Sequence, residues 1–517
     1  MAIYYIFFSV IAILYFTYYF LLRNKNYWKT RNVPFVDPLP FFGNFKDSLL
    51  LKRHMNLVEQ EICRQFPNEP YVGAFYGTEP ALIVQDPSLL KLVLSKEFYF
   101  CNGRETSDYN DRELLSKNMF FAYGDEWKVL RTNLTPLFTS AKLKNMFYLI
   151  NNYADNLERL LAEEIETDPN IEIRNLLSKY TIGCISSCAF GVSSDTMKKN
   201  VKDNPFVTVA DQIFDTSAFR AFKNIGRSMW PGIFYALGFK LLEDDVRRFF
   251  NDLLSGVFRK REETKSSKND FVDLILNWKR ENSITGDTLS NIETGEKKKV
   301  SIEVNDELLI SQCVLFFAAG FETTSTSISF LVYELAKNKT VQERVIQEVD
   351  EYFAQHKEIE YECINRMPFI ESCLEESLRL YPVLGVITRE VIHDYTLPTG
   401  LRFAKGDRIH IPIYHIQRNP LNFPEPEEFR PERFFGEGKQ KNIKPYTYMP
   451  FGEGPRICIG MRFAKMPIFA AVLKIFKKYR VELAENMTGE MVMNPRAVIT
   501  QTVSGIHVKF IPRKDNN

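Results

Sequence analysis

Helical periodicity dominates the pattern of apolar and polar positions along the chain. Alternation typical of strands occurs near Tyr71–Gln85, with two shorter stretches at Ile387–Val391 and Arg408–Ile413. The pattern therefore predicts a mainly α fold with a minor β region. Residues 281–300 are polar and end in three lysines, which predicts a solvated loop.

The longest predicted helix begins after Asn305 and runs to about Lys337, because Asn305 is a good N-cap and two acidic residues follow it. Within it lies Ala319-Gly320-Phe321-Glu322-Thr323-Thr324. A glycine costs up to about 1 kcal/mol relative to alanine inside a helix, and a threonine hydroxyl that bonds back to a carbonyl can bend it. This stretch predicts either a local distortion or a close helix-packing contact with an incidental glutamate.

The first 22 residues carry no charge, and as a helix rising about 1.5 Å per residue they can cross a hydrocarbon layer of about 30 Å. Basic residues follow this stretch and none precedes it, which places the body in the cytoplasm. They are Arg23, Lys25, Lys29 and Arg31. A cleaved signal peptide would need a basic start, a shorter apolar core and a small-residue cleavage site. We predict a membrane anchor over 1–22, a basic, proline-rich hinge over 23–45 and one large domain over 46–517.

Charge and cysteine content narrow the class of protein. Sixty-six Lys and Arg against 65 Asp and Glu leave a net charge of +1, which gives no global positive field for nucleic acid. A mean hydropathy of −0.22 excludes a polytopic membrane protein. The eight cysteines form no Cys-x-x-Cys pair, so a reduced, cytosol-facing body is expected. Cys184 and Cys188 are interpreted as two small buried residues on one helix face.

The most informative stretch runs from Phe451 to Gly460. Gly454 and Gly460 remove side chains where the backbone must approach something flat and bulky. Arg456 offers a fixed cation for a carboxylate, and Cys458 is a soft anionic ligand once deprotonated. The helix predicted from Met461 is expected to lower the pKa of this thiol through the N–H groups at its start. A dinucleotide loop is not supported because its third glycine is missing, whereas a core cysteine in a glycine-rich turn remains open.

The pattern Phe-x-x-Gly-x-Arg-x-Cys-x-Gly is matched at every specified position by Phe451, Gly454, Arg456, Cys458 and Gly460. It resembles the haem-binding signature of the cytochrome P-450 monooxygenases. The resemblance implies the cytochrome P-450 fold with an N-terminal single-span anchor, haem as cofactor and Cys458 as axial ligand of its iron. It also implies that Trp127, Arg131, Arg389 and Arg456 bind the haem propionates. Trp127 and Arg131 lie four residues apart on a predicted helix and so share one face.

The resemblance also implies roles for two further groups of residues. Ala319 and Gly320 would leave room for dioxygen, Thr323 would hydrogen-bond the reduced oxygen, and Glu322 would help to relay protons. Glu376 and Arg379 by themselves predict only a weak surface pair one helical turn apart. In the family they join Arg433 in a buried ion network that holds the loop on the haem side.

Three stretches resemble the insect microsomal branch called family six, namely residues 134–140, 188–191 and 458–463. The branch implies oxidation of lipophilic xenobiotics such as plant toxins or insecticides at the endoplasmic reticulum membrane. Oxidation of endogenous lipids or hormones, isomerase or dehydratase chemistry, and binding without turnover remain alternatives. The aromatic region 206–239 is expected to roof the active site and dip into the membrane.

The chain has no flavin or NADPH fingerprint, so electrons must come from another protein. The resemblance implies NADPH-cytochrome P-450 reductase, with cytochrome b5 as a further partner. A basic docking patch for an acidic flavodomain is expected. Its residues are Lys128, Lys142, Lys144, Lys439, Lys441 and Arg462.

Overall fold

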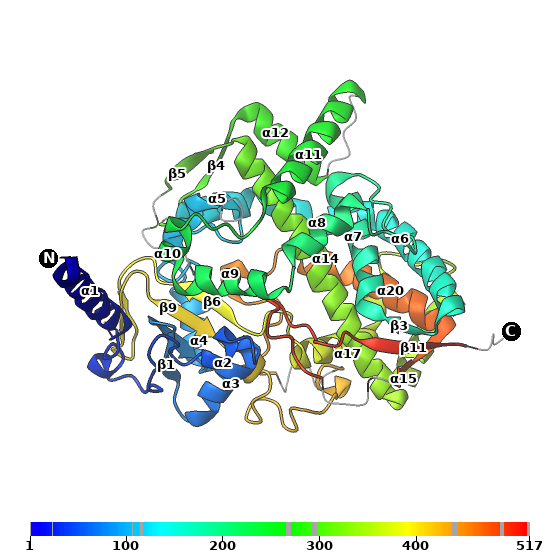
Figure 1. Ribbon diagram of the computed structural model, residues 1–517. Coiled ribbons are helices and arrows are strands. Elements are labelled where there is room, and N and C mark those ends of the chain that lie inside the picture. The colour runs from blue at the N-terminus through cyan, green and yellow to red at the C-terminus, as the bar shows by residue number, and fades with distance from the viewer. Residues whose placement is uncertain are drawn as a thin grey trace.

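The computed structural model describes residues 2–22, 24–105, 107–113, 117–264, 270–290, 295, 297–436, 443–485, 487 and 491–513. Helices make up most of the body and the sheets are small, so the predicted fold class of mainly α with a minor β region is confirmed. Figure 1 shows the long helix α14 running through the middle of the helical part, with the main sheet on the side from which the N-terminal helix projects.

The first half of the chain supplies the helices α1 (Ala2–Leu22), α2 (Lys46–Leu49), α3 (Met55–Gln65), α4 (Pro87–Lys91), α5 (Gly124–Leu134), α6 (Ser140–Thr167), α7 (Ile173–Phe190), α8 (Pro205–Ile213), α9 (Ala218–Met229), α10 (Pro231–Ala236) and α11 (Asp244–Thr264). The second half supplies α12 (Phe271–Glu281), α14 (Asp306–Lys337), α15 (Lys339–Gln355), α16 (Cys363–Arg366), α17 (Pro368–Leu380), α18 (Ile413–Ile416) and α20 (Met461–Lys478). Shorter turns of helix are η1 (Lys29–Arg31), η2 (Leu92–Lys96), η3 (Ser107–Arg112), η5 (Thr135–Phe138), η6 (Pro431–Arg433) and η7 (Gly454–Arg456).

The main sheet has the strand order β1-β2-β9-β6, in which β2 and β9 are parallel and the other pairs antiparallel. Its strands are β1 (Tyr71–Tyr76), β2 (Glu79–Val84), β6 (Ile387–Glu390) and β9 (Arg408–Ile411), where the sequence predicts strands. A second sheet joins β10 (Tyr479–Leu483), β11 (His507–Pro512) and β3 (Asn170–Glu172). Two hairpins complete the set, β4 (Ser283–Asp287) with β5 (Lys299–Glu303), and β7 (Tyr395–Thr396) with β8 (Arg402–Phe403).

Helix α14 has the bounds that its capping residues predict. The Asn305 side chain accepts a hydrogen bond from the backbone N–H of Leu308 at 2.9 Å, which satisfies one of the free donors of the first turn. The helix runs unbroken through the predicted weak point at Gly320. A Cβ atom at Gly320 would lie 2.6 Å from Cδ1 of Ile185, so the glycine lets α7 pack closely on α14.

The prediction of a solvated loop over 281–300 is wrong at both ends. Residues from Ser283 pair in register with residues up to Glu303 as the β4–β5 hairpin. Ile284 is buried, and Gly286 lies against Val129 of α5, so the hairpin has a packed face. The polar composition hid this arrangement because only one strand residue is fully buried.

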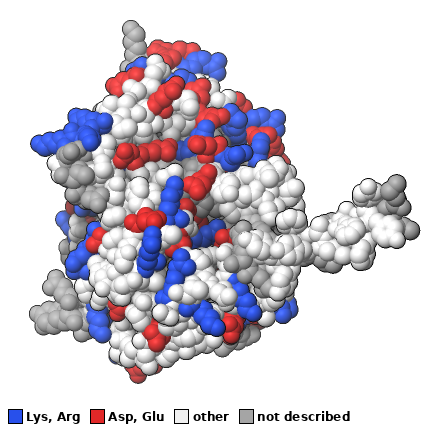
Figure 2. Space-filling model, turned by 90° about the vertical axis from the view of Figure 1, so that its left-hand side faces the viewer, with Lys and Arg blue, Asp and Glu red and all other residues white. Residues whose placement is uncertain are grey.

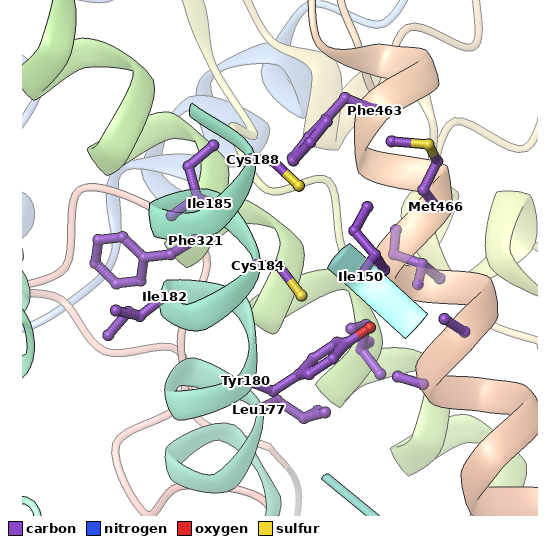
Figure 3. Close-up of a cluster of buried hydrophobic side chains, with 14 of the residues drawn as sticks. Ile150, Leu177, Tyr180, Ile182, Cys184, Ile185, Cys188, Phe321, Phe463 and Met466 are labelled. Atoms are coloured by element: carbon purple, nitrogen blue, oxygen red, sulfur yellow. The ribbon is translucent and has the colours of Figure 1, made fainter. Parts of the chain in front are cut away.

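Cys184 and Cys188 are buried on α7, as their interpretation as small core residues requires. Figure 3 shows both sulfur atoms pointing from α7 toward α20, where Phe463 and Met466 lie, with Ile182 on the other side of α7. Burial raises the pKa of both thiols, which keeps them protonated and unreactive.

Helix α1 has 21 residues without a charge, and its described side chains are exposed, Tyr4 by 70%. The segment after it is attached to the body through Trp28, which is buried and donates its indole N–H to the carbonyl of Ala74 at 2.9 Å. Arg23 lies outside the described residues. Among the helices whose side chains are described throughout, which leaves out α1, one is long and apolar enough to cross a membrane, and this is α14. Its most apolar window is 72% buried, as in a core helix.

A buried cation holds three elements together at the main sheet. The ring of His410 on β9 contacts Glu59 of α3 at 2.5 Å and Glu105 at 2.8 Å. Burial acts to lower the pKa of His410, but the two carboxylates outweigh it and raise this pKa to about 10. His410 is therefore a cation at neutral pH.

This ion cluster predicts a loss of stability at alkaline pH. The pKa of His410 is raised from 6.5 to about 10 on folding, so its contribution is complete below the unfolded value and is lost as pH rises through the folded one. We expect the free energy of unfolding to fall by a few kcal/mol over that window, measured by thermal unfolding at stepped pH. His410→Gln should flatten this fall, and His507→Gln on β11 should keep it. An unchanged alkaline slope in His410→Gln would contradict the assignment.

Candidate active site

A deep cavity lies between α14 and the loop that precedes α20. Ten of the residues proposed from the sequence line it: Trp127, Arg131, Ala319, Gly320, Thr323, Arg389, Phe451, Arg456, Cys458 and Gly460. They come from α5, α14, β6 and the segment from Phe451 to Gly460. Residues more than 300 positions apart along the chain therefore face one space.

The segment around Cys458 is a tight loop whose glycines are required by backbone geometry. Gly454 has a φ of +74°, and a Cβ atom there would lie 1.9 Å from the carbonyl oxygen of Leu94. No other residue fits this position without moving η2 away from η7. The backbone N–H of Cys458 donates to the carbonyl of Phe451 at 2.9 Å, which closes the loop. Gly454 thus shapes the loop from behind and does not line the cavity.

Cys458 lies deep in the body, yet it is the one cysteine with an exposed side chain because it opens onto the cavity. Burial raises the pKa of its thiol, while the backbone N–H of Gly460 and the charge of Arg131 lower it. The start of α20 lowers this pKa as expected, through the backbone N–H of Gly460, but burial outweighs that contact and the net shift is upward. A soft thiol at the centre of an apolar wall suits binding to a metal ion that stabilises the thiolate.

Four guanidinium groups gather at one end of the cavity, from Arg104, Arg131, Arg389 and Arg456. No carboxylate occurs among the described residues that line it. Burial lowers the pKa of Arg456 well below its usual value, and repulsion from Arg104, Arg389 and Arg131 lowers it further. The Nε atoms of Arg389 and Arg456 are buried without a hydrogen-bond partner. Such a cluster fits a ligand that carries more than one negative charge.

Arg104 is a cavity residue that the sequence analysis missed. Its guanidinium lies 3.8 Å from the ring centroid of Phe120, beside the cavity. The surrounding residues, Cys101-Asn102-Gly103-Arg104, form no motif, so only the folded chain brings this arginine to the others.

Trp127 and Arg131 lie on one face of α5, as their spacing predicts. Arg131 donates to the carbonyl of Ile457 at 2.8 Å and so supports the loop beside Cys458. The guanidinium of Arg456 lies 5.0 Å from the ring centroid of Trp127 and donates to the carbonyl of Phe120 at 3.1 Å. These contacts fix the orientation of the donors that surround the cavity.

The rest of the cavity lining is apolar apart from a few hydroxyl groups on α14. Ala319 is exposed to the cavity, and the hydroxyl of Thr323 donates to the Ala319 carbonyl at 2.7 Å. Phe316 stacks on Phe138 with ring centroids 5.7 Å apart. The other apolar lining residues include Met119, Phe120, Ile185, Leu315, Val383, Leu384 and Ile387. This surface suits an apolar ligand.

Glu322 does not line the cavity. Its buried carboxylate forms an ion pair with Arg174 and accepts a hydrogen bond from Gln501 at 2.8 Å. Successive helical residues differ in direction by about 100°, so Glu322 points away from the face on which Thr323 lies. The sequence predicts both side chains at one site, and the structure separates them.

The structure brings Glu376, Arg379 and Arg433 together below the cavity. Arg379 forms two parallel hydrogen bonds to the Glu376 carboxylate, at 2.7 and 2.9 Å, and both side chains are completely buried. Arg433 contacts the same carboxylate at 3.2 Å. Arg379 also donates to the backbone carbonyls of Gln417, Pro426 and Glu428. The network thus ties α17 to the loops that follow α18.

Comparison with known proteins shows the same relationship along the whole chain. The model of the family described as cytochrome P450 matches residues 33–510. The chain is 35% identical to cytochrome P450 6B2 of Helicoverpa armigera over 512 residues, which cover 98% of each protein. It is 36% identical to cytochrome P450 6B1 of Papilio polyxenes, with 96% of this chain and 97% of that one covered. Cytochrome P450 6k1 of Blattella germanica is 32% identical, with 94% and 93% covered.

The cavity and the comparisons agree on the kind of cofactor. A thiol at one wall and a cluster of cations at one end suit a metal macrocycle that carries carboxylates. The matched region contains all of these residues. The chain therefore belongs to the cytochrome P450 family of monooxygenases, whose cofactor is a haem with a thiolate-bound iron.

Proposed function

We propose that this protein is a membrane-anchored monooxygenase that inserts one oxygen atom of O2 into lipophilic xenobiotics such as plant toxins or insecticides. The observation that carries the proposal is the apolar lining of the cavity onto which Cys458 opens, which would hold substrate by burial of apolar surface rather than by charge. NADPH would supply the electrons through a separate reductase. The similarity to cytochromes P450 6B2 and 6B1 supports the monooxygenase chemistry.

In this proposal Cys458 binds the haem iron, and Arg104, Arg131, Arg389, Arg456 and Trp127 bind the two haem carboxylates. The bound haem supplies the oxygen activation and the oxidation itself. The protein provides the geometry, because the carbonyl contacts of Arg131 and Arg456 hold the cations in place. The apolar lining of the cavity would exclude water from the reacting substrate.

Thr323 is the proposed donor of a hydrogen bond to oxygen at the reactive centre, for which its one hydroxyl hydrogen must turn away from the Ala319 carbonyl. Ala319 and Gly320 leave space beside it, because neither carries a side chain larger than a methyl group. We propose that Glu322 serves as the proton reservoir from the other face of α14. Arg174 and Gln501 hold its carboxylate there. Proton transfer to Thr323 then requires Glu322 to move or a water molecule to bridge the two.

The proposed location is the endoplasmic reticulum membrane, with the body on the cytoplasmic side. The uncharged helix α1, 21 residues long, is the proposed anchor, which at about 1.5 Å per residue is long enough for one crossing. Figure 2 shows it as an uncharged arm beside a lobe of uncharged surface. Apolar side chains that lie exposed on α9, on α10 and near residue 40 support contact with lipid. They are Leu39, Phe41, Phe219, Phe222, Ile233, Leu237 and Phe239.

NADPH-cytochrome P450 reductase, with cytochrome b5 as an additional donor, is the proposed redox partner. Lys128 on α5 and Arg462 on α20 flank the elements that carry the site. Lys144 on α6 forms an ion pair with Glu362 and so is partly neutralised. Lys439 and Lys441 lie outside the described residues. Weaker reduction after charge reversal at Lys128 would support this docking face.

A reconstitution experiment separates turnover from binding alone. The full chain, loaded with haem, is mixed with reductase, NADPH and a panel of plant toxins, insecticides and fatty acids. Product formation with NADPH consumption that depends on the compound would support the proposal, and preference for fatty acids would favour the endogenous-lipid alternative. Spectral binding without NADPH consumption by any compound would overturn the proposal and leave a haem protein that sequesters lipophilic compounds.

Replacing Thr323 with alanine should divert electrons to hydrogen peroxide. The variant keeps the apolar lining of the cavity but loses the hydroxyl group that lines it. We expect product per NADPH to fall by at least about 10-fold, because proton transfer by a positioned side chain contributes about 10²–10⁴-fold to a rate. Thr340→Ala on α15, remote from the cavity, is the control. An unchanged ratio of product to NADPH would remove Thr323 from proton delivery.

A further inference from the structure

Helix α9 exposes apolar side chains and buries charged ones, which is the reverse of an ordinary surface helix. Phe219 and Phe222 are 64% and 66% exposed, whereas Arg220, Lys223 and Arg227 are buried. Buried cations need anionic partners, so the underside of this helix is attached to the body through charges. We call residues 218–242, which include α9 and α10, the roof.

The strongest of these attachments is Glu113, at the end of η3. One of its carboxylate oxygens accepts hydrogen bonds from the backbone N–H groups of Leu241 and Leu242. The other accepts from the hydroxyl of Tyr235 at 2.9 Å and lies 3.5 Å from Nε of Arg227. All four donors belong to the roof. A single buried carboxylate therefore contacts the last turn of α9, the C-terminal end of α10 and the segment that follows α10.

Glu105 makes a second attachment at the end of α9. It accepts a hydrogen bond from the hydroxyl of Ser228 at 2.8 Å and contacts His410 of the main sheet through its other oxygen. Arg408 donates to the carbonyl of Ser228 at 2.6 Å. Because His410 is itself held by Glu59, this attachment connects the roof to the rigid sheet.

The segment under the roof forms one wall of the active-site cavity. We call the described residues of 104–121 the wall, of which Arg104, Met119 and Phe120 line the cavity. The next residue, Phe121, lies on the outer side, where its ring centroid is 5.2 Å from the guanidinium of Arg227. Figure 1 shows α9 and α10 crossing the space between the main sheet and the upper helices. The roof thus covers the outer side of the wall.

From these contacts we propose that Glu113 is a latch residue, whose release lets the roof lift from the wall and admits apolar ligands to the cavity. Ion pairs and hydrogen bonds can be exchanged for contacts with water at modest cost, whereas an apolar interface cannot. The exposed aromatic side chains of the roof remain in contact with lipid while its charged underside separates. The proposal rests on the proposed function, since it treats the lipid-facing roof as the route of a lipophilic substrate.

The test compares Glu113→Ala and Glu113→Gln with Asp111→Asn, which removes an exposed acid from the same short helix η3. Hydrogen–deuterium exchange is followed on the haem-loaded full chain in detergent. We expect amides of residues 218–242 to exchange roughly tenfold faster in Glu113→Ala, with a smaller increase in Glu113→Gln. Amide exchange in α20 should be unchanged in both Glu113 variants. Asp111→Asn should match the unmodified protein in all segments.

The rate of ligand entry gives the second readout. Phenylimidazole is an apolar probe whose binding to haem changes its absorbance, so its association rate can be measured by stopped flow. We expect this rate to rise several-fold in both Glu113 variants. Because the two side chains act as one unit, Glu113→Gln combined with Arg227→Gln should have no larger effect than either change alone.

Three results would overturn the latch. They are unchanged exchange in 218–242, an unchanged association rate, and full additivity of the Glu113 and Arg227 changes. If Glu113→Ala does not fold, Glu113→Gln decides the matter because its amide oxygen can still accept the backbone hydrogen bonds. Neither readout needs turnover. Absence of product from the unmodified enzyme would therefore count against the proposed function and not against the latch.

Discussion

Replacing Cys458 with serine is expected to abolish monooxygenase activity and the red-shifted absorbance that a thiolate-bound haem shows under carbon monoxide. A serine hydroxyl is smaller, harder and rarely ionised, so it cannot donate electron density to iron as a thiolate does. The surrounding loop should persist, because its turn depends on Gly454 and on the hydrogen bond from the backbone N–H of residue 458 to Phe451.

The measurement is the carbon monoxide difference spectrum of the reduced protein, with total haem and product determined in parallel. Cys63→Ala, at a buried thiol on α3 away from the cavity, is the control and should retain the spectrum. A full thiolate signal in Cys458→Ser would show that another residue binds the iron. Cys188 also lines the cavity but is buried, and Cys458 is the one described cysteine with an exposed side chain. That result would therefore remove the basis of the proposed site.

The second large effect is expected at Arg379. Its removal leaves the Glu376 carboxylate completely buried with only the backbone N–H of Arg430 and the longer contact to Arg433. It also leaves three backbone carbonyls without their donor. Breaking a buried pair from one side costs about 3–5 kcal/mol. We therefore expect Arg379→Ala to accumulate little haem-loaded protein and to show a much lower thermal midpoint.

The matched control is Arg430→Ala. The Arg430 side chain pairs with Glu425 at the surface, whereas its backbone N–H donates to Glu376 and survives the substitution. A surface pair contributes at most about 1 kcal/mol. If Arg379→Ala were no more destabilising than Arg430→Ala, the buried network would not be a determinant of stability.

The sequence predicts those features of the fold and of the site that depend on a few neighbouring residues. Asn305 and the acids after it predict the start of α14 because capping depends on a few neighbouring residues. The spacing of Trp127 and Arg131 predicts a shared face because helical geometry is fixed. The Cys458 loop was recognisable because its motif resembles that of a known family, but the role of Gly454 in packing against Leu94 became visible only in the structure.

Contacts between distant segments could not be predicted in this way. Arg104 reaches the cavity only because the chain before it packs on the main sheet, and no neighbouring residue signals this. Glu322 was expected beside Thr323, but Arg174 from α7 and Gln501 from the C-terminal region draw it to the opposite face. Glu113 shows no pattern in the sequence, since its four donors lie over 110 positions away.

The four arginines at the end of the cavity have a consequence for the life of the protein in the cell. Before an anionic cofactor neutralises them, these like charges repel one another in a medium of low polarity, which favours the unfolded chain. Cofactor binding then adds its free energy to folding by mass action. The steady-state amount of this enzyme should accordingly follow the rate at which the cell makes haem, because newly synthesised chains that lack it are exposed to proteases.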